Sequence, residues 1–308
     1  MIEGFQRDRI YSLIVGTAED AVEINNLQIK FDVVKTKSNK DKKNTAKVEI
    51  YNLSEERRKK LEQDFIQVSL KVGYAHTGLS TLFTGQVVNV SNAKVKPFLS
   101  KKSGADIITT LEITELYEEL NGTQVSKLVP AGKTVGDAIR EVAKAMPSIG
   151  SVQMNGRGIS TTLPDGYPLS GNPVHILDRI SSDYHIDWQI DNKTLLISDV
   201  DGSFENKDKT LVPKIGQMSG LIESPEYVNE EAKRLRREVA GKTKKYKNPK
   251  ENSLKIKILL NPTIVAGSVF KLEFGEITGF YIVSEVRHKG GYRDNDWYSE
   301  ILATQKID

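Results

Sequence analysis

The sequence predicts a mainly β protein with an α/β insertion, in which two antiparallel β-barrel or β-sandwich modules flank a small α/β domain. Apolar and polar residues alternate along segments of the first and last thirds of the 308 residues, which is the period of a strand with one buried face. In the middle third, apolar residues instead recur at helical spacing between connections rich in Gly and Pro. We therefore expect three domains, at residues 1–118, 119–206 and 207–308.

The first module is expected to be built from strands. Leu27, Ile29, Phe31 and Val33 alternate with polar residues, which puts the apolar set on one face of a sheet. Further segments fit strands, at residues 47–50, 66–73, 82–90 and 107–116. The Lys-rich segment 94–102 between the last two is expected to be a solvated loop.

A short helix is predicted after the second of these strands. Ser54 is placed to cap it, because a serine oxygen at that position accepts a backbone N–H of the first turn. Glu55 and Glu56 open the helix, and residues 57–60, all basic, close it. Both ends therefore match the helix dipole.

The middle module carries two helix signals. Thr134 followed by Asp137 resembles a capping box, and the apolar stripe that follows stops at Pro147. Asn172 and Pro173 fit the cap and first position of a second helix. A hairpin is expected next, with its turn at residues 191–193.

The last module returns to alternation, at residues 254–260 and 270–274. Two short segments then look alike across the chain, Phe83-Thr84-Gly85 and Ile277-Thr278-Gly279. Each is expected between a strand and its partner, where glycine permits a bulge or turn. We interpret the likeness as a sign that the outer modules are related, with a chance match as the alternative.

Composition excludes some chemistry and favours none. Lys and Arg number 44 against 41 Asp and Glu, so the net charge of +3 is too small to indicate nucleic acid or an anionic membrane by itself. The absence of cysteine excludes a disulfide framework, a thiolate metal site and a cysteine nucleophile. The N-terminus lacks a signal pattern, and no apolar run of 18 residues occurs, so we expect a soluble, unexported chain without a membrane partner.

The order of the turn signals resembles the central hub family of contractile phage baseplates. The matching residues of the first third are 46–54 (AKVEIYNLS), 72–74 (VGY) and 82–85 (LFTG). In the last third they are 260–262, Gly267 before 270–272, 279–288 (GFYIVSEVRH), and 297 leading to 303. The resemblance spans the chain and depends on the order and spacing of these segments.

The resemblance implies a structural protein of the virion, with no catalytic, cofactor or metal residues. Each protomer would contribute two tail-tube-like barrels, so that a homotrimer imitates a six-fold ring. The ring would join the hexameric tail tube to the trimeric central spike in the tail baseplate, with baseplate wedge components and the tape-measure protein as further partners. DNA would only pass through the lumen, and assembly would take place in the host cytoplasm.

Two alternatives stay open within this interpretation. Because the outer modules can exchange strands around the insertion, residues 207–230 complete either the second barrel or the first. Another tail-end structural protein, such as a distal tail protein, also uses tube-like barrels. The identity of the partners would separate it from a hub.

A metal-assisted hydrolase is the enzymatic alternative. Asp183, His185 and Asp187 would share one face of a strand, as metal ligands do. We favour solvent-facing strand and turn residues instead, because Asp and His prefer wet faces. The sequence has no HExxH, GxSxG or phosphate-loop motif.

The basic segment 233–250 is the most conspicuous polar feature. Its candidate docking residues are Lys233, Arg234, Arg236, Arg237, Lys244 and Lys245. Only Tyr246 offers a ring for stacking on a base, so a nucleic-acid-binding module is the weaker hypothesis. We favour a solvated, projecting segment or one that docks on an acidic protein surface.

Overall fold

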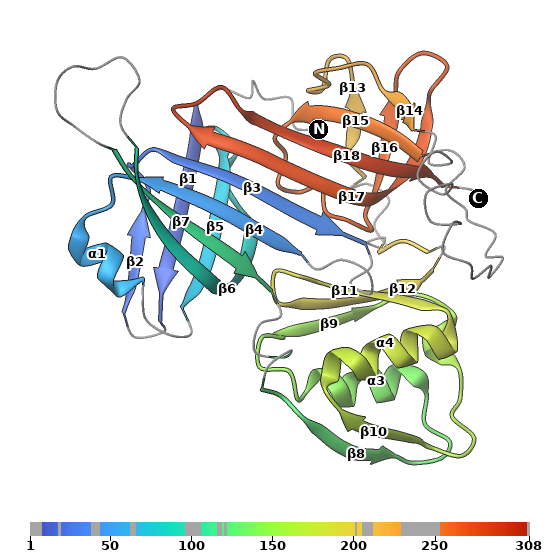
Figure 1. The fold of residues 1–308 in the computed structure, drawn as a ribbon. Helices are drawn as coiled ribbons and strands as arrows, with labels where there is room; N and C mark the ends of the chain where they lie inside the picture. Colours follow the sequence, from blue (N-terminus) through green and yellow to red (C-terminus); the bar gives the residue numbers. More distant parts are fainter. Residues whose placement is uncertain are drawn as a thin grey trace, which may run out of the picture.

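The computed structural model is a broad twisted sheet with a smaller unit beside it (Figure 1). It describes residues 8–17, 20–37, 44–61, 66–95, 106–115, 119, 122–200, 202–204, 212–228 and 253–306. Strands dominate these residues, and the two longer helices both lie in the smaller unit. The predicted class, mainly β with an α/β insertion, is confirmed. No helix in the part of the chain that the structure describes is long and apolar enough to cross a bilayer.

The N-terminal third follows the alternation of its sequence. Its elements are β1 (Arg9–Gly16), β2 (Ala21–Ile24), β3 (Ile29–Thr36), β4 (Thr45–Tyr51), α1 (Glu55–Lys60), β5 (Gln67–Tyr74), β6 (Gly78–Val95) and β7 (Asp106–Thr114). Ser54 caps α1 as predicted, since its hydroxyl accepts the N–H of Arg57. The predicted loop at 94–102 was partly wrong, because Lys94 and Val95 still belong to β6; residues 96–102 lie outside the described residues.

The middle third is the α/β insertion. Its elements are β8 (Val125–Val129), α3 (Val135–Ala143), β9 (Ser151–Met154), a 3-10 turn (Gly158–Ser160), β10 (Tyr167–Gly171), α4 (Pro173–Tyr184), β11 (Ile186–Asp191) and β12 (Thr194–Asp199). Thr134 and Asp137 form the predicted capping box, and Asn172 accepts the N–H of Val174 to cap α4. The predicted hairpin is β11–β12, whose turn residues Asn192 and Lys193 both have positive φ.

The C-terminal third adds β13 (Lys214–Gly216), β14 (Glu226–Val228), β15 (Ser253–Leu259), β16 (Val269–Glu273), β17 (Gly279–Tyr292) and β18 (Trp297–Gln305). Within the segment that the sequence left open, residues 207–230, β13 pairs with β16 and β14 pairs with β15. Its described strands therefore extend the C-terminal module rather than the first one.

One continuous sheet joins the two outer modules. Its strand order is β14-β15-β18-β17-β3-β4-β7-β6-β5-β1-β2, with β16 paired to β17 and β13 to β16. The joint is the antiparallel pair of β17 and β3, which runs from Glu285↔Thr36 to Tyr292↔Ile29. The described residues form three hydrophobic cores, and the N-terminal core also includes Leu260 and Trp297 from the last third.

Strand order is repeated in the two outer modules. The order β3-β4-β7-β6-β5 of the first module matches β14-β15-β18-β17-β16 of the second, and every neighbouring pair in both series is antiparallel. The next strand breaks the match, because β1 is antiparallel to β5 whereas β13 is parallel to β16.

The residue register is repeated as well. Gln86 lies opposite Thr114 in the first module, as Ile282 lies opposite Thr304 in the second. When the two modules are aligned on these pairs, the bulge after Val87 in β6 falls at the same position as the bulge after Val283 in β17. A bulge at the same register in the same strand is a shared feature of two modules rather than a local irregularity.

This register corrects the motif comparison made from the sequence. Gly85 lies opposite Val68 inside β6, and the residue in the same position of β17 is Tyr281, opposite Phe270. Gly279 stands two residues earlier, at the start of β17. The matched tripeptides are therefore two residues out of structural register, and Gly85 lies within a strand rather than in a turn.

Candidate functional site

The predicted strand face of Asp183, His185 and Asp187 does not form. Asp183 lies in α4 and accepts the hydroxyl of Tyr167 at 2.9 Å, while His185 ends that helix with a left-handed φ of 54°. Only Asp187 lies on a strand, β11. The prediction failed because α4 runs on to Tyr184. Among the residues that the structure describes, no cluster of three or more His, Asp or Glu side chains could hold a metal ion.

The basic docking candidates lie outside the described residues. Lys233, Arg234, Arg236, Arg237, Lys244 and Lys245 belong to the stretch between Val228 and Ser253. Their docking role stays a prediction.

A shallow groove crosses the charged face of the sheet. It is lined by side chains of β3, β4, β6, β7 and β17, among them Asp32, Lys47 and Arg287. These charges pair with neighbours rather than converging on the groove: Arg287 Nε donates to Asp32 Oδ1 at 2.7 Å, and Lys47 Nζ lies 2.8 Å from Glu49 Oε1. Paired surface charges of this kind contribute little to stability.

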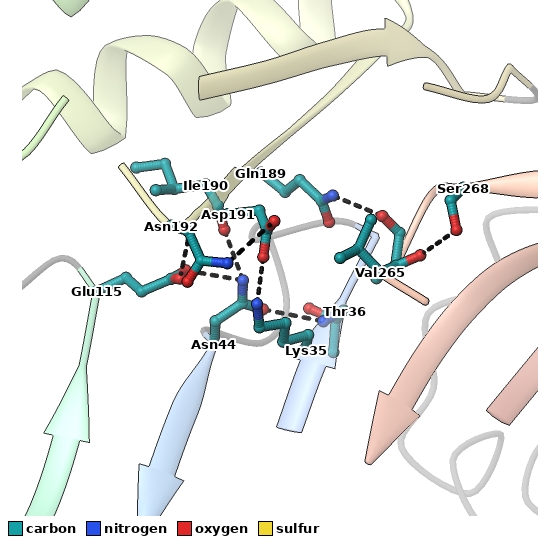
Figure 2. Close-up of polar contacts among 11 residues, drawn as sticks. Lys35, Thr36, Asn44, Glu115, Gln189, Ile190, Asp191, Asn192, Val265 and Ser268 are labelled. Carbon is teal, nitrogen blue, oxygen red and sulfur yellow. Dashed lines mark hydrogen bonds and ion pairs between the residues drawn. The ribbon is translucent and has the colours of Figure 1, made fainter. Parts of the chain in front are cut away.

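A buried polar cluster connects the insertion to the first module, and we call it the polar junction (Figure 2). It consists of Lys35 at the end of β3, Asn44 before β4, Glu115 after β7, and Asp191 and Asn192 at the β11–β12 turn. Lys35, Asn44 and Glu115 are at most 4% exposed. The junction therefore joins segments that are far apart in the sequence, and Asp191 and Asn192 at its edge are half-buried.

Each member of the polar junction has a partner. Lys35 Nζ forms an ion pair with Asp191 Oδ1. Asn44 Nδ2 donates to Glu115 Oε2 at 2.8 Å and to the carbonyl of Ile190 at 2.6 Å, and Asn44 Oδ1 accepts the N–H of Thr36 at 2.9 Å. The N–H of Asn192 donates to Glu115 Oε1 at 3.2 Å. Asn192 Oδ1 is buried without a hydrogen-bond partner, so the network is satisfied at Lys35, Asn44 and Glu115 but not at every atom. Losing one of its buried contacts would leave a further polar group unpaired, which is costly in a site of low dielectric constant.

The same hairpin also contacts the C-terminal module. Gln189 Nε2, on β11, donates to the carbonyl of Ala266 at 2.7 Å. Figure 2 shows this contact beside Val265 and Ser268, where the hydroxyl of Ser268 donates a hydrogen bond to the carbonyl of Val265. Lys37 Nζ, just after β3, donates to the carbonyl of Val200 at 2.7 Å. The insertion is thus held against both outer modules.

Burial governs the charge of two groups near these contacts. Burial raises the pKa of Glu115 to about 8, and the Asp191 carboxylate adds to the rise, although Lys35, Asn44 and the N–H of Asn192 favour the ionised form. Burial, followed by the charge of Lys35, lowers the pKa of His288 to about 3. His288 is on β17 and its Nδ1 lies 2.7 Å from Ser299 Oγ. Both groups are held in their neutral forms near neutral pH.

The polar junction was missed from the sequence, although it has a signal there. Lys35 continues the apolar register of Phe31 and Val33, and Glu115 continues that of Leu111 and Ile113. A charged residue in the inward register of a strand marks a buried charge that needs a partner.

Comparisons with known proteins identify the fold. The structure is similar to a tail protein of Neisseria meningitidis MC58, with a TM-score of 0.62 and 12% identity over 96% of each chain. It is also similar to the 43 kDa tail protein of prophage MuSo2 from Shewanella oneidensis, with a TM-score of 0.60 and 7% identity over 96% of this chain and 98% of the other. A third similar structure is an E. coli protein described as a component of the type VI secretion system, at a TM-score of 0.57 and 11% identity over 91% of this chain and 74% of the other. No protein-family model and no curated protein matches the chain.

Proposed function

We propose that the chain is a structural protein of a phage-type tail end, and specifically the central baseplate hub of a contractile tail. Three copies form a ring that adapts the hexameric tail tube to the trimeric central spike. In this proposal the domains are residues 1–118, 119–206 and 207–308, and baseplate wedge components and the tape-measure protein are further partners. DNA crosses the ring only in transit.

The repeated five-strand order is the observation that supports this proposal most. One chain holds two arrays of the same order and register, joined edge to edge in a single sheet. Three such chains around a three-fold axis present six similar arrays. A part that meets a six-fold ring on one side and a three-fold spike on the other needs this combination.

Similarity to solved structures supports the same proposal. The proteins of Neisseria and Shewanella are tail proteins, and the E. coli component is described as structurally similar to the T4 bacteriophage tail proteins gp27 and gp5. A distal tail protein is the second candidate, because tube-like barrels would serve it as well. Binding to a spike protein distinguishes the hub from it.

The mass of the assembled protein tests the proposal. Light scattering should show three chains of 34.4 kDa each, for the purified protein alone or after mixing with tube and spike proteins. The mixture should also contain the spike in a complex with the ring. A monomer under all of these conditions would overturn the proposed function, and a trimer that binds the tube but never the spike would favour the distal tail protein.

A further inference from the structure

The equivalent strands β17 and β6 differ at one edge. This edge is covered in the C-terminal array, β14-β15-β18-β17-β16, and open in the N-terminal array, β3-β4-β7-β6-β5. In β17, residues 285–290 pair with β18 on one side, and residues 285–292 pair with β3 on the other. None of residues 285–292 is exposed. The same stretch of β6, residues 89–95, pairs with β7 on one side only, as far as the described residues extend. All of it except Val90 is exposed, and the exposed fraction of Val95 is 45%.

A second open edge belongs to β14. This strand occupies the place of β3, because Val228 lies opposite Ser253 as Val34 lies opposite Thr45. The far side of β3 is covered by β17, whereas among the described residues no strand covers the far side of β14. Tyr227 on β14 is 60% exposed.

We propose that β14 of one copy pairs antiparallel with residues 89–95 of β6 in the next copy, in the register that β3 and β17 adopt within one chain. This inference rests on the proposed function, since it states how the copies of the ring join. Within the chain, Arg287 lies opposite Val34 and Lys289 opposite Asp32. Carried over, Ser91 lies opposite Val228 of the partner subunit, and Ala93 opposite Glu226 of the partner subunit.

The composition of the β6 edge agrees with pairing. Residues 87–95 read VVNVSNAKV, with a single charge at Lys94 and neither Pro nor Gly. Natural strand edges that stay unpaired are usually protected by charges, prolines or bulges, so a long, neutral, exposed edge is a site for strand addition. The bulge at Val88 lies just before residues 89–95 and has its counterpart at Ser284, just before the β17–β3 joint.

The two open edges differ from each other, which determines the kind of assembly. A contact between β6 of one copy and β14 of the next is heterologous, so it repeats around a rotation axis, and once the ring closes it covers residues 89–95 of β6 and the far side of β14 in every copy. In a ring of three copies, the β6–β14 contacts between copies alternate with the β17–β3 joints within each copy. The sheet would then run continuously through six arrays.

Cysteine pairs test this register directly, because the chain has no cysteine of its own. The full-length Ala93→Cys, Glu226→Cys variant places two thiols on residues that face each other, where Cα atoms lie about 4.5–5.5 Å apart. That separation suits a disulfide. Mild oxidation followed by a non-reducing gel should give covalently linked chains, up to three. The matched control, Ala93→Cys with Val228→Cys, is two residues out of register and should link several-fold more slowly.

The outcomes separate this inference from the proposed function. A trimer by light scattering in which both cysteine pairs link equally, or not at all, would overturn the register while the ring stands. Dimers formed by Ala93→Cys alone would show that two β6 edges pair with each other, which also overturns it. A monomer alone and with tube and spike proteins would overturn both. If the first variant fails to fold, Ser91→Cys with Val228→Cys is a second in-register pair with the same expected result.

Discussion

Replacing Glu115 by Gln should remove a loss of stability that the wild type suffers at mildly alkaline pH. The pKa of Glu115 is about 8 in the folded protein against an ordinary value of 4.5. Because the folded-state pKa is raised, the stabilisation is complete below pH 4.5 and is lost as pH rises towards 8. Each pH unit in that window lowers the free energy of unfolding by about 1.4 kcal/mol.

His288 has the opposite effect in an overlapping window. Its folded-state pKa of about 3 lies below the ordinary value of 6.5, so its stabilisation is complete above pH 6.5 and is lost as pH falls towards 3. The two slopes cancel between pH 4.5 and 6.5. From pH 6.5 to 8, Glu115 is the one of these two groups that changes stability, and the wild type should lose about 2 kcal/mol, which is 1.5 pH units at about 1.4 kcal/mol each.

Urea unfolding at pH 6.5 and pH 8.0, followed by the fluorescence of Trp188 and Trp297, measures this difference. In Glu115→Gln the difference should vanish. The variant should also be less stable at pH 6.5, because its NH2 group can accept neither from Asn44 nor from the N–H of Asn192, whereas the hydroxyl oxygen of the protonated carboxyl can. Glu112→Gln, at an exposed position of β7 three residues before Glu115, is the matched control and should keep the wild-type slope. A wild type with equal stability at both pH values, or a Glu115→Gln variant that keeps the slope, would refute the reasoning.

Three further predictions concern the junctions and the basic segment. Lys35→Met leaves Asp191 in the polar junction without its cation and should lower the free energy of unfolding by about 3–5 kcal/mol in urea, with much of the loss restored by adding Asp191→Leu. Gly290→Ala at the β17–β3 joint places a Cβ 2.1 Å from the Phe31 ring and should cost about 1–3 kcal/mol in the same assay, whereas Lys289→Ala beside it should cost less. Arg236→Glu with Arg237→Glu should weaken binding to an acidic tail partner in a pull-down; a DNA shift at low ionic strength that these changes abolish would instead favour the nucleic-acid hypothesis.

Local rules predicted much of the fold. The caps at Ser54, Thr134 and Asn172 all formed, because a capping side chain reaches backbone groups only two or three residues away. Alternation along residues 66–73 and 254–260 identified inward-facing positions for the same reason. These features depend on neighbours that the sequence places side by side.

Contacts between residues far apart in the chain could not be predicted from the sequence. The β3–β17 joint pairs residues 255 positions apart, as in the Asp32–Arg287 ion pair, and no local pattern encodes which edges meet. The polar junction gathers Lys35, Glu115 and Asp191, each of which has an ordinary local context. The matched tripeptides were misaligned by two residues, since short turn-like motifs recur independently of strand register.

The β3–β17 joint also affects how the chain folds during synthesis. Ribosomes add about 5–20 residues per second, so β3 waits roughly 13–50 s for its partner to be made. Throughout that time its edge is open to strands of other nascent chains. Slow, non-local pairing of this kind exposes a chain to aggregation, so fragments that end before β17 should need chaperones to remain in solution.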